Sequence, residues 1–588
     1  MTFFNRYWSA GCGFASCTLL VLATGCSEPE PPTGAAPAMA ADTIYFGGNI
    51  ITLDEANPNV EAVAVKRGKI IATGLRVDLE QARKGARTAM VDLAGKTLIP
   101  GFVDAHSHFA QVGVQAISAN LLPPPDGAAA TIPKLQQILR EFIGTSPTVK
   151  AYGVLVGFAY DDSQLAEHRH PTRQELDAVS TDIPIVITHQ SGHLGVYNSN
   201  ALARVGITAD SVDPPGGTIH READGKTPSG LLDENAHFAA LMQTLPKFTA
   251  EQMLAMLAAA QQIYIENGFT TVQDGRTDPR TLSALPVAAT AGLFKIDVVA
   301  YPDLVMNEKS PLLTGPLMSR SYTDHFRIGG VKLGFDGSPQ GKTAWFTQPY
   351  FKEPQGANAD YAGFPIFSND AEPERLMTLA FRNNWQVQVH ANGDAAIDQL
   401  IRVVGGAQAA VPGPDRRTVL VHGQYLRADQ IPQIKSLGIF PALFPMHTFY
   451  WGDWHRESVA GPQRAEFISP TGAVLAAGMR FSIHSDAPVT FPNSMRVLDS
   501  AVNRTTRTGY VLGADQRIEP LVALKAMTFW SAYQHFEEAT KGSIEVGKVA
   551  DLVILSDNPL TVERAKLVEI KVDETIKEGV SIYRRAGS

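Results

Sequence analysis

The most regular feature of the sequence is a series of short segments, between residues 98 and 484, in which apolar and polar positions alternate. Alternate side chains share one face of a β-strand, so each segment is predicted to be a strand. Stretches with helical periodicity separate the segments, which is typical of βα units. The predicted strands are Phe102–His106, Phe269–Gln273, Lys295–Tyr301, Ile328–Phe335, Gln386–His390, Thr418–His422, Ile439–Leu443 and Arg480–His484.

These parallel strands with intervening helices predict an α/β fold, a (β/α)8 TIM-like barrel whose functional residues lie at the carboxyl ends of the strands. We assign residues 98–537 to the barrel, with an insertion subdomain at about 120–247 after its first strand. Short strands separated by Gly and Asn turns precede the barrel, and similar sequence follows it. Because chain termini often lie close together, we expect residues 42–97 and 538–588 to form one flanking, composite β-sandwich.

The polar faces of the predicted strands carry the residues of chemical interest. In the fifth strand, Gln386, Gln388 and His390 share one face, and Val387 and Val389 share the other. The apolar faces would pack on the outer helices, so the polar faces would line the barrel. Buried polar side chains are costly unless something satisfies them, and a metal ion would do so.

Composition narrows the class of protein. The chain has 588 residues, of which 44% are hydrophobic and 19% charged, as in an ordinary globular protein. Its 50 basic and 59 acidic residues give a net charge of −9 without basic clusters, which argues against nucleic-acid binding. All three cysteines, Cys12, Cys17 and Cys26, lie in the first 26 residues. The body of the protein therefore has no thiol for a disulfide, a thiolate metal site or nucleophilic catalysis.

Residues 1–26 have the pattern of an export signal. One basic residue, Arg6, precedes an apolar segment that is too short and too interrupted to span a membrane. Its end, Leu-Ala-Thr-Gly-Cys, resembles the lipobox of bacterial lipoproteins. This resemblance implies a lipoprotein signal peptide, a lipid anchor at Cys26, and a protein held at the periplasmic face of a membrane or at the cell surface. Residues 27–41, rich in Pro and Ala, are then a flexible tether. Plain secretion is the alternative.

Two histidines lie at the end of the first predicted barrel strand. His106 and His108 are two residues apart, so both rings share a face and can bind one divalent ion. Such a pair arises readily by chance among 15 histidines, and His168 and His170 have the same spacing. The second pair follows no apolar strand and precedes a proline, so we expect an exposed turn there.

Several motifs resemble those of the metal-dependent amidohydrolase superfamily, and they cover nearly everything after Asp42. They are PGFVDAHSH at 100–108, Lys332 followed by Asp336-Gly-Ser, His390 in Val-His-Ala-Asn-Gly-Asp, His422, Asp486 in Ser-Asp-Ala-Pro, and GKVADLVIL at 547–555. Within the superfamily, PTRQELD at 171–177, Gly192-His193, NSNAL at 198–202 and PPGG at 214–217 resemble the branch that contains N-substituted formamide deformylase.

The resemblance implies a set of metal ligands. His106 and His108 would bind one divalent ion, and His390 and His422 would bind a second. We expect one or two ions, with zinc as the first candidate.

The same resemblance implies roles for Lys332 and Asp486. Lys332 stands where relatives carry a carboxylated lysine that bridges two ions. An unmodified ammonium would repel the metals, so a bridge requires a carbamate formed from the neutral amine and CO₂. The alternative is a plain lysine paired with Asp336 or Asp274. Asp486 would be the catalytic carboxylate, and its alternative role is to cap the next helix.

The expected reaction is hydrolysis of a non-peptide carbon–nitrogen bond in a small N-acyl or N-formyl amide, by attack of metal-bound hydroxide. The ion lowers the pKa of bound water and polarises the scissile carbonyl. Asp486 would take the proton and return it to the departing amine. Deamination or cyclic-amide hydrolysis at the same site is one alternative. A catalytically inactive, lipid-anchored metal- or solute-binding protein is another, although a binder needs no general base. The sequence leaves the oligomeric state open.

Four further residues are candidates for substrate contact. His193, in the insertion, would contact the substrate or an oxyanion. His484, two residues before Asp486, is a further ligand, a substrate contact or a satisfied core histidine. Trp345 and Trp451 lie in loops rich in aromatic residues, which indicates that the substrate carries an apolar or aromatic substituent. Packing between the loops would account for these aromatic residues equally well. Candidate cations for an anionic substrate group are Arg276, Lys342 and Arg456.

Overall fold

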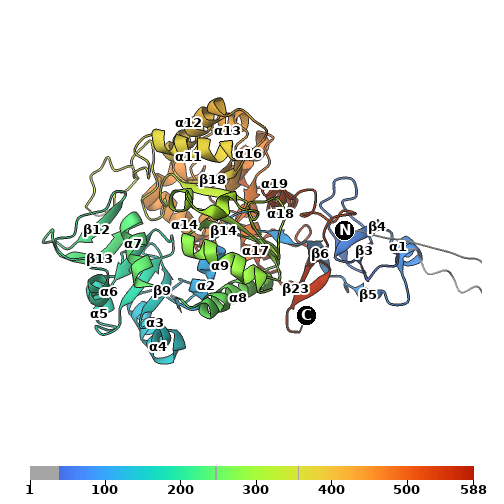
Figure 1. The fold of residues 1–588 in the computed structure, drawn as a ribbon, viewed down its shortest axis with the longest axis horizontal. Coiled ribbons are helices and arrows are strands. Elements are labelled where there is room, and N and C mark those ends of the chain that lie inside the picture. Colours follow the sequence, from blue (N-terminus) through green and yellow to red (C-terminus); the bar gives the residue numbers. More distant parts are fainter. Residues whose placement is uncertain (1–38, 246–247, 355, 588) are drawn as a thin grey trace, which may run out of the picture.

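The computed structural model describes residues 39–245, 248–354 and 356–587. Strands and helices form a central body, with strands from both chain ends on one side and a further sheet with helices on the other (Figure 1). The predicted signal peptide, Cys26 and most of the tether lie outside the described residues. Within the described ranges, every helix is too short or too polar to cross a membrane.

Parallel strands in two sheets build the central body. One sheet has the order β16-β15-β14-β7, and the other has the order β17-β18-β19-β20-β21. The strands are β7 Phe102–Val103, β14 Phe269–Thr277, β15 Asp297–Pro302, β16 Phe326–Ile328, β17 Gly330–Gly334, β18 Gln386–Ala391, β19 Val419–His422, β20 Phe440–Leu443 and β21 Ser482–Ile483.

Main-chain hydrogen bonds connect these two sheets at both edges. On one side, Lys332 of β17 forms a parallel bridge with Asp303, the residue that follows β15. At the other edge, the N–H of His108 donates to the carbonyl of Ala487 at 2.7 Å, which joins the segments after β7 and β21. The central body therefore has the predicted TIM-barrel-like α/β fold.

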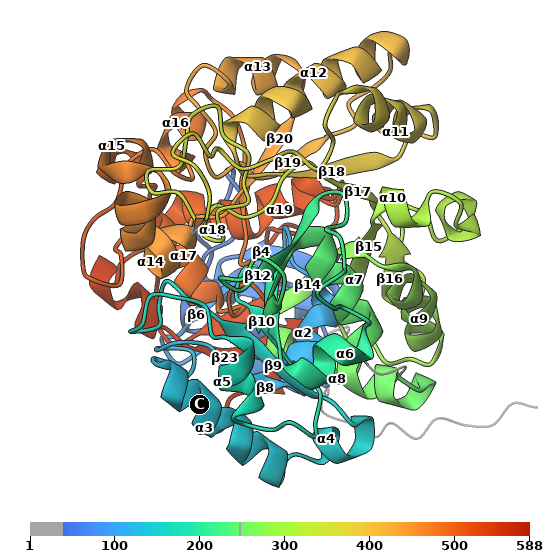
Figure 2. The same ribbon diagram turned by 90° about the vertical axis from the view of Figure 1, so that its left-hand side faces the viewer.

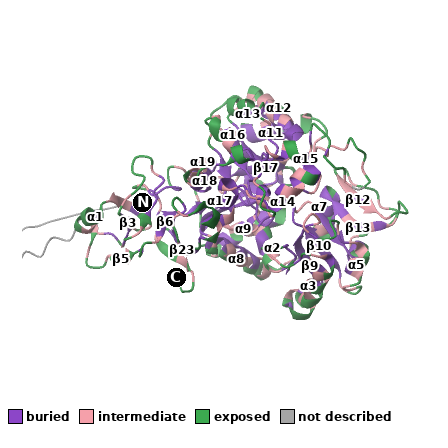
Figure 3. Cartoon of the chain, turned by 180° about the vertical axis from the view of Figure 1, so that it is seen from behind, coloured by how far each residue is buried: buried purple, intermediate pink, exposed green. Residues whose placement is uncertain are grey.

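Helices cover the outside of these strands, and Figure 3 shows buried residues concentrated in the strands with exposed residues on the outer helices. Val387 and Val389 of β18 belong to the same buried cluster as Leu400 and Val403 of α12, as the alternation predicts. The α-helices are α2 Phe109–Ala116, α8 Ala250–Glu266, α9 Pro279–Thr290, α10 Leu304–Asn307, α11 Ala371–Arg382, α12 Asp394–Ala410, α13 Ile431–Ser436, α14 His447–Trp454, α15 Gly461–Ala465, α16 Thr471–Ala476, α17 Ser494–Val502, α18 Pro520–Met527 and α19 Phe529–Gln534. The 3-10 helices are η1 Pro311–Thr314, η3 Ala514–Gln516 and η4 Arg564–Glu569, and η2 His455–Val459 is a π-helix.

Strands from the two chain ends lie together beside the barrel. One sheet has the order β4-β3-β1-β5, and the other, β2-β6-β22-β23-β24, pairs β6 with β22 antiparallel. Tyr45, Val63, Leu98, Leu552 and Ile576 share one buried cluster between them. The elements are β1 Thr43–Phe46, β2 Asn49–Ile50, β3 Ala62–Lys66, β4 Lys69–Gly74, α1 Arg76–Arg83, β5 Ala89–Asp92, β6 Thr97–Pro100, β22 Leu552–Leu555, β23 Val572–Lys577 and β24 Val580–Arg584.

A separate sheet, in the order β12-β13-β11-β10-β9-β8, forms between α2 and α8 of the barrel. In Figure 2 its strands and helices lie in front of the barrel strands β14 and β17. Its elements are β8 Ala119–Asn120, α3 Ile132–Thr145, α4 Pro147–Tyr152, β9 Leu155–Tyr160, α5 Arg173–Asp177, β10 Ile185–His189, β11 Leu194–Tyr197, α6 Ser199–Arg204, β12 Gly217–Arg221, β13 Pro228–Asp233 and α7 Glu234–Thr244.

Candidate metal centre

The predicted ligands come together at the carboxyl ends of the barrel strands. The ring centroid of His106 lies 5.2 Å from that of His108 and 5.4 Å from that of His422. The ring of His390 lies 4.6 Å from that of His422. Nζ of Lys332 is 3.0 Å from Nε2 of His106. Residues that are up to 316 positions apart in the chain, from His106 to His422, thus share one site, in which His106, Lys332 and His422 are buried and His108 and His390 are partly buried.

Hydrogen bonds fix which nitrogen of the first two histidines faces the site. Nδ1 of His106 lies 2.6 Å from Oε1 of Gln273, whose own amide nitrogen donates to a main-chain carbonyl. Nδ1 of His108 lies 2.7 Å from the carbonyl oxygen of Gly275. Both oxygens only accept, so Nδ1 carries the proton in each ring and Nε2 carries a lone pair. The two Nε2 atoms lie 3.3 and 3.4 Å from Oδ1 of Asp486, as ligands of a shared metal ion would.

Several buried polar atoms at this site have no hydrogen-bond partner among the described residues. By hydrogen-bond geometry they are Nδ1 of His390, Nδ1 of His422, both ring nitrogens of His484 and Oδ1 of Asp486. Nδ1 of His390 does lie 3.2 Å from Oδ1 of Asp336, and Oδ1 of Asp486 faces the Nε2 atoms of His106 and His108. Each such atom costs about 1–3 kcal/mol if it is left unsatisfied. The ligand atoms of His106, His422 and Asp486 all lie within 4.8 Å of one another. Lone pairs that converge in this way fit a divalent cation, so the residues present suit the metal that the motifs predict.

Lys332 is buried beside these histidines. Burial lowers the pKa of its ammonium to about 7, and the positive charge of Arg276 acts in the same direction. The carboxylates considered as alternative partners are engaged elsewhere. Asp336 accepts main-chain N–H groups at 2.7–3.1 Å, and Asp274 accepts the hydroxyl of Thr277 at 2.6 Å. The observed neighbour of Lys332 is therefore the histidine cluster.

Four non-glycine residues around the site have left-handed backbone conformations, as do other residues elsewhere in the described chain, such as Leu53 and Arg504. His422 has a φ of 72° and Asp486 a φ of 54°, and Arg276 and Glu234 have φ values of 57° and 47°. Non-glycine residues in this region cost about 1–3 kcal/mol each and persist where the surrounding structure holds them. These four residues lie at or near strand ends or at a helix start around one centre.

His193 comes from the insertion to the edge of the site. Its ring lies 5.4 Å from that of His390, and its Nδ1 lies 2.8 Å from Oε2 of Glu234. Glu234 was missed by the sequence analysis, because its 41-residue separation from His193 gives no local signal. His484 stacks on Phe444 at 4.9 Å and is buried. The assignments of His193 and His484 to substrate or metal remain predictions.

The two predicted aromatic contacts differ in exposure. Trp451 is 1% exposed, and its indole N–H donates to the carboxylate of Asp161. Trp345 is only partly buried, and its main-chain N–H donates to Asp336 at 3.1 Å. A contact between either ring and a substrate remains a prediction.

A second group of buried polar residues, in the insertion, was not predicted. Nε2 of His189 lies 3.0 Å from Asp162 and 3.7 Å from Asp161. Burial alone lowers the pKa of His189, but its bonds to the two carboxylates raise it to about 9. This group is an ion-pair cluster in which protonated His189 offsets the negative charge of Asp161 and Asp162.

The prediction of an exposed turn at His168 and His170 is right for the first residue and wrong for the second. His168 is exposed, whereas His170 is partly buried and its Nε2 lies 3.8 Å from Asp162.

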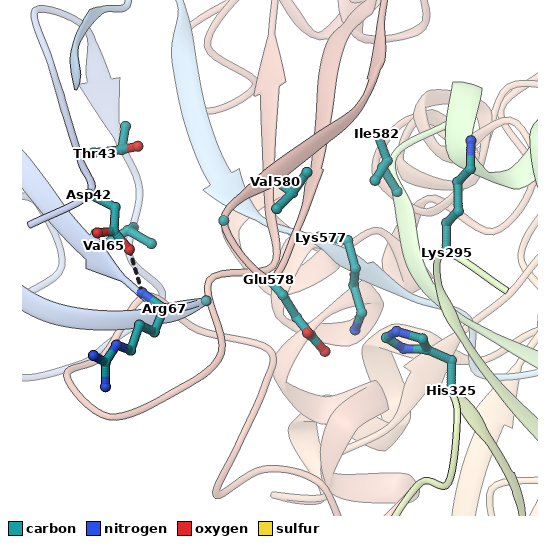
Figure 4. A pocket seen from close by; sticks show the side chains of 12 residues that line it. Asp42, Thr43, Val65, Arg67, Lys295, His325, Lys577, Glu578, Val580 and Ile582 are labelled. Atoms are coloured by element: carbon teal, nitrogen blue, oxygen red, sulfur yellow. Dashed lines mark hydrogen bonds between the residues drawn. The ribbon is translucent and has the colours of Figure 1, made fainter. Parts of the chain in front are cut away.

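A cavity of about 580 Å³ lies at the opposite, amino ends of strands β15 and β16, where they meet the chain ends (Figure 4). Arg67, Lys295 and His325 are among its lining residues. Asp297, which accepts from His325 at 2.7 Å, also accepts from the ammonium of Lys577 at 2.6 Å. These positive charges disfavour a cation there, so the cavity does not duplicate the metal centre.

Comparisons with known proteins agree with this geometry. A family model described as the amidohydrolase family matches residues 89–583. The chain is 27% identical over 566 residues to N-substituted formamide deformylase of Arthrobacter pascens, which covers 93% of this chain and 99% of that protein. It is 26% identical over 571 residues to protein LONG AFTER FAR-RED 3 of Arabidopsis thaliana, covering 94% and 93%.

Solved structures share the fold. A metal-dependent hydrolase from Pyrococcus horikoshii superposes with a TM-score of 0.69 at 24% identity, covering 89% of this chain and 99% of that one. A metal-dependent hydrolase from Pyrococcus furiosus gives a TM-score of 0.67 at 23% identity, covering 88% and 100%. The predicted family is confirmed: this chain belongs to the amidohydrolase family and is a hydrolase of carbon–nitrogen bonds.

Proposed function

We propose that the protein hydrolyses a small N-acyl or N-formyl amide with an apolar or aromatic substituent, and that it uses one or two divalent ions, with zinc first among them. The observation that carries the proposal is the set of buried, unpartnered nitrogen and oxygen atoms at the ends of the barrel strands, counted among the described residues. The similarity of this chain to N-substituted formamide deformylase supports an amide as the substrate.

The histidines are the proposed metal ligands. His106 and His108 hold one ion through Nε2, and His390 and His422 hold the second. Lys332, 3.0 Å from Nε2 of His106, carries a carbamate that replaces a repelling ammonium by an anionic ligand. When bound, a divalent ion lowers the pKa of a water ligand and polarises the substrate carbonyl.

Asp486 is the proposed general base and general acid. Its carboxylate lies 3.3 Å from Nε2 of His106 and 3.4 Å from Nε2 of His108. A carboxylate that only capped a helix would accept main-chain N–H groups, and the Asp486 side chain accepts none from the described residues. It can therefore accept a proton from the attacking water and deliver it to the amine nitrogen as the carbon–nitrogen bond breaks.

His193 is the proposed contact to the substrate carbonyl. Glu234 accepts from its Nδ1 and so fixes the orientation of the ring beside His390. A polar group held in place before the reaction stabilises developing charge at no cost of reorganisation. His484, Trp345 and Trp451 complete the proposed substrate contacts.

The remaining assignments are proposals on organisation and location. Residues 42–97 and 538–588 form the composite sandwich, and about 120–247 the insertion subdomain; the pairing of β6 with β22 and the separate sheet β8–β13 support these assignments. A signal peptide over 1–26 and acylation at Cys26 would place the enzyme at the periplasmic face of a membrane or at the cell surface, with 27–41 as its tether.

Metal content tests the proposal. We expect elemental analysis of the protein expressed without residues 1–26 to give about two zinc ions per chain, with fewer in Lys332→Ala. A screen of N-formyl and N-acetyl amides on the same samples should give activity that a chelator abolishes and zinc restores. One ion in both samples would contradict the bridge at Lys332. A folded protein that binds no metal after supplementation would contradict the whole proposal.

A further inference from the structure

One arginine lies beside the metal centre with part of its hydrogen-bonding capacity unused. Arg276 follows Gly275, whose carbonyl accepts from His108, and it has a left-handed φ of 57°. Its guanidinium lies 4.7 Å from the ring of Phe238, and that ring lies 5.8 Å from the ring of His193. Arg276 is thus part of the wall formed by the end of β14 and helix α7 of the insertion.

The guanidinium is held at one end and free at the other. Nε donates to Oδ2 of Asp303 at 3.1 Å, whereas the two terminal amino groups have no hydrogen-bond partner in the part of the chain that the structure describes. The Arg276 side chain is 25% exposed. Oδ1 of Asp303 accepts hydrogen bonds from the main-chain N–H groups of Val305 and Met306, so this carboxylate also caps the N-terminus of α10. The outer edge of the guanidinium therefore remains available for a second, bidentate anion.

The other two candidate cations are engaged elsewhere. Lys342 donates to the carbonyl of Lys352 at 3.0 Å and lies over the ring of Trp454. Arg456 lies 3.8 Å above the ring of Tyr510 and 3.8 Å from Glu466. Arg276 is also close enough to Lys332 and His390 for its charge to act on both. Of the three cations, Arg276 is the one placed to meet a substrate at the metal centre.

We infer that Arg276 binds a carboxylate on the substrate through its free amino groups, so that the amide hydrolysed is an N-acyl or N-formyl amino acid. This inference rests on the proposed function and narrows its substrate class. The Phe238 ring beside the guanidinium offers an apolar surface for the side chain of such a substrate. Strain at Arg276 is then the cost of directing a cation into the site.

Two ligands that differ only by the carboxylate provide the test. N-acetyl-L-phenylalanine and N-acetylphenethylamine share the amide and the aromatic ring. In the zinc-loaded protein we expect kcat/KM for the first to exceed that for the second. In Arg276→Gln it should fall about 10- to 100-fold for the carboxylate substrate and less than threefold for the other, because only the first loses hydrogen bonds to a charged group. Arg276→Lys should keep part of the preference. Arg375→Gln, which removes an exposed arginine paired with Glu308 and Glu372, is the matched control. It should leave kcat/KM for both substrates unchanged.

Binding without turnover separates the inference from the proposed function. Calorimetric titration of Asp486→Asn with the same two ligands should show tighter binding of N-acetyl-L-phenylalanine, and this difference should vanish in Asp486→Asn/Arg276→Gln with metal content and thermal midpoint unchanged. If that difference is found but neither ligand nor any other amide is hydrolysed by the parent, the proposed function fails, and the recognition of a carboxylate by Arg276 stands without it. Equal binding of the two ligands, or equal losses for both in Arg276→Gln, would overturn the inference.

Discussion

At the scale of single residues, the metal centre depends on side chains that hold the ligands as much as on the ligands. The Gln273 amide oxygen receives the Nδ1 proton of His106, which leaves the lone pair on Nε2 toward the site. Such partners orient the ring and raise the basicity of the ligand. Gln273 is fully buried, so no water can replace its oxygen.

We therefore expect Gln273→Leu to weaken metal binding about 10- to 100-fold with little change in overall stability beyond the lost bonds. Chelator competition, read by the zinc released, measures the affinity. Gln399→Leu is the control, since Gln399 is equally buried but bonds to the carbonyl of Phe367, away from the site. Unchanged affinity in Gln273→Leu would show that the protein sets the orientation of His106 by other means.

The residues of the site differ in whether a local sequence pattern marks them. His106, His108 and Asp486 lie in short motifs that alternate with strand periodicity, so the sequence predicts them. Glu234 and Gln273 meet their histidines only after the chain folds, across separations of 41 and 167 residues, and no local pattern marks them. Arg276 was among the candidate cations, but its free edge is visible only in the fold.

At the scale of elements, the alternation of polar and apolar residues predicts the strands because packing on the helices requires it. The predicted ends are less accurate. β7 ends at Val103 rather than at His106, and β21 spans only Ser482–Ile483. The residues after β7 turn part of their main chain to the segment after β21, as when the N–H of His108 donates to the carbonyl of Ala487. Hydrogen bonding to a distant strand, which a single segment does not encode, sets where each strand stops.

The close approach of β17 and β18 provides a test at this scale. A Cβ at Gly330 would lie 2.2 Å from the carbonyl oxygen of Gln386, a main-chain atom that cannot move aside. We expect Gly330→Ala to destabilise the protein by about 1–3 kcal/mol, as overpacking does. Gly405→Ala is the opposite control: nothing lies within 4 Å of a Cβ there, and α12 should gain about 1 kcal/mol. Thermal unfolding measures both, and equal midpoints in the two variants would contradict the expected strand geometry.

At the scale of the whole molecule, buried charges join the chain ends to the barrel. Asp297, at the start of β15, accepts from Lys577 of β23 at 2.6 Å and from Lys541 at 2.5 Å. Glu537 lies 2.9 Å from Lys541 and 2.6 Å from Arg327 of β16. The sequence predicts that the two ends pair, but it gives no sign of this network, whose members are up to 280 residues apart.

The pH dependence of stability should report on this network through Glu537. Burial alone raises its pKa, but the charges of Lys541 and Arg327 lower it from 4.5 to about 2. A carboxyl whose pKa is lower in the folded state adds stability above the unfolded value, and that contribution is lost as the pH falls from 4.5 toward about 2. At 1.4 kcal/mol per pKa unit the contribution is about 3.5 kcal/mol at neutral pH. We expect Glu537→Gln to lower the free energy of unfolding by about this amount at pH 7, and the gap to the parent to close as the pH approaches 2. Glu80→Gln, which breaks an exposed pair with Arg76, should leave almost no gap at any pH. A gap for Glu537→Gln that stays constant over this range would show that the side chain stabilises the protein by packing and not by its charge.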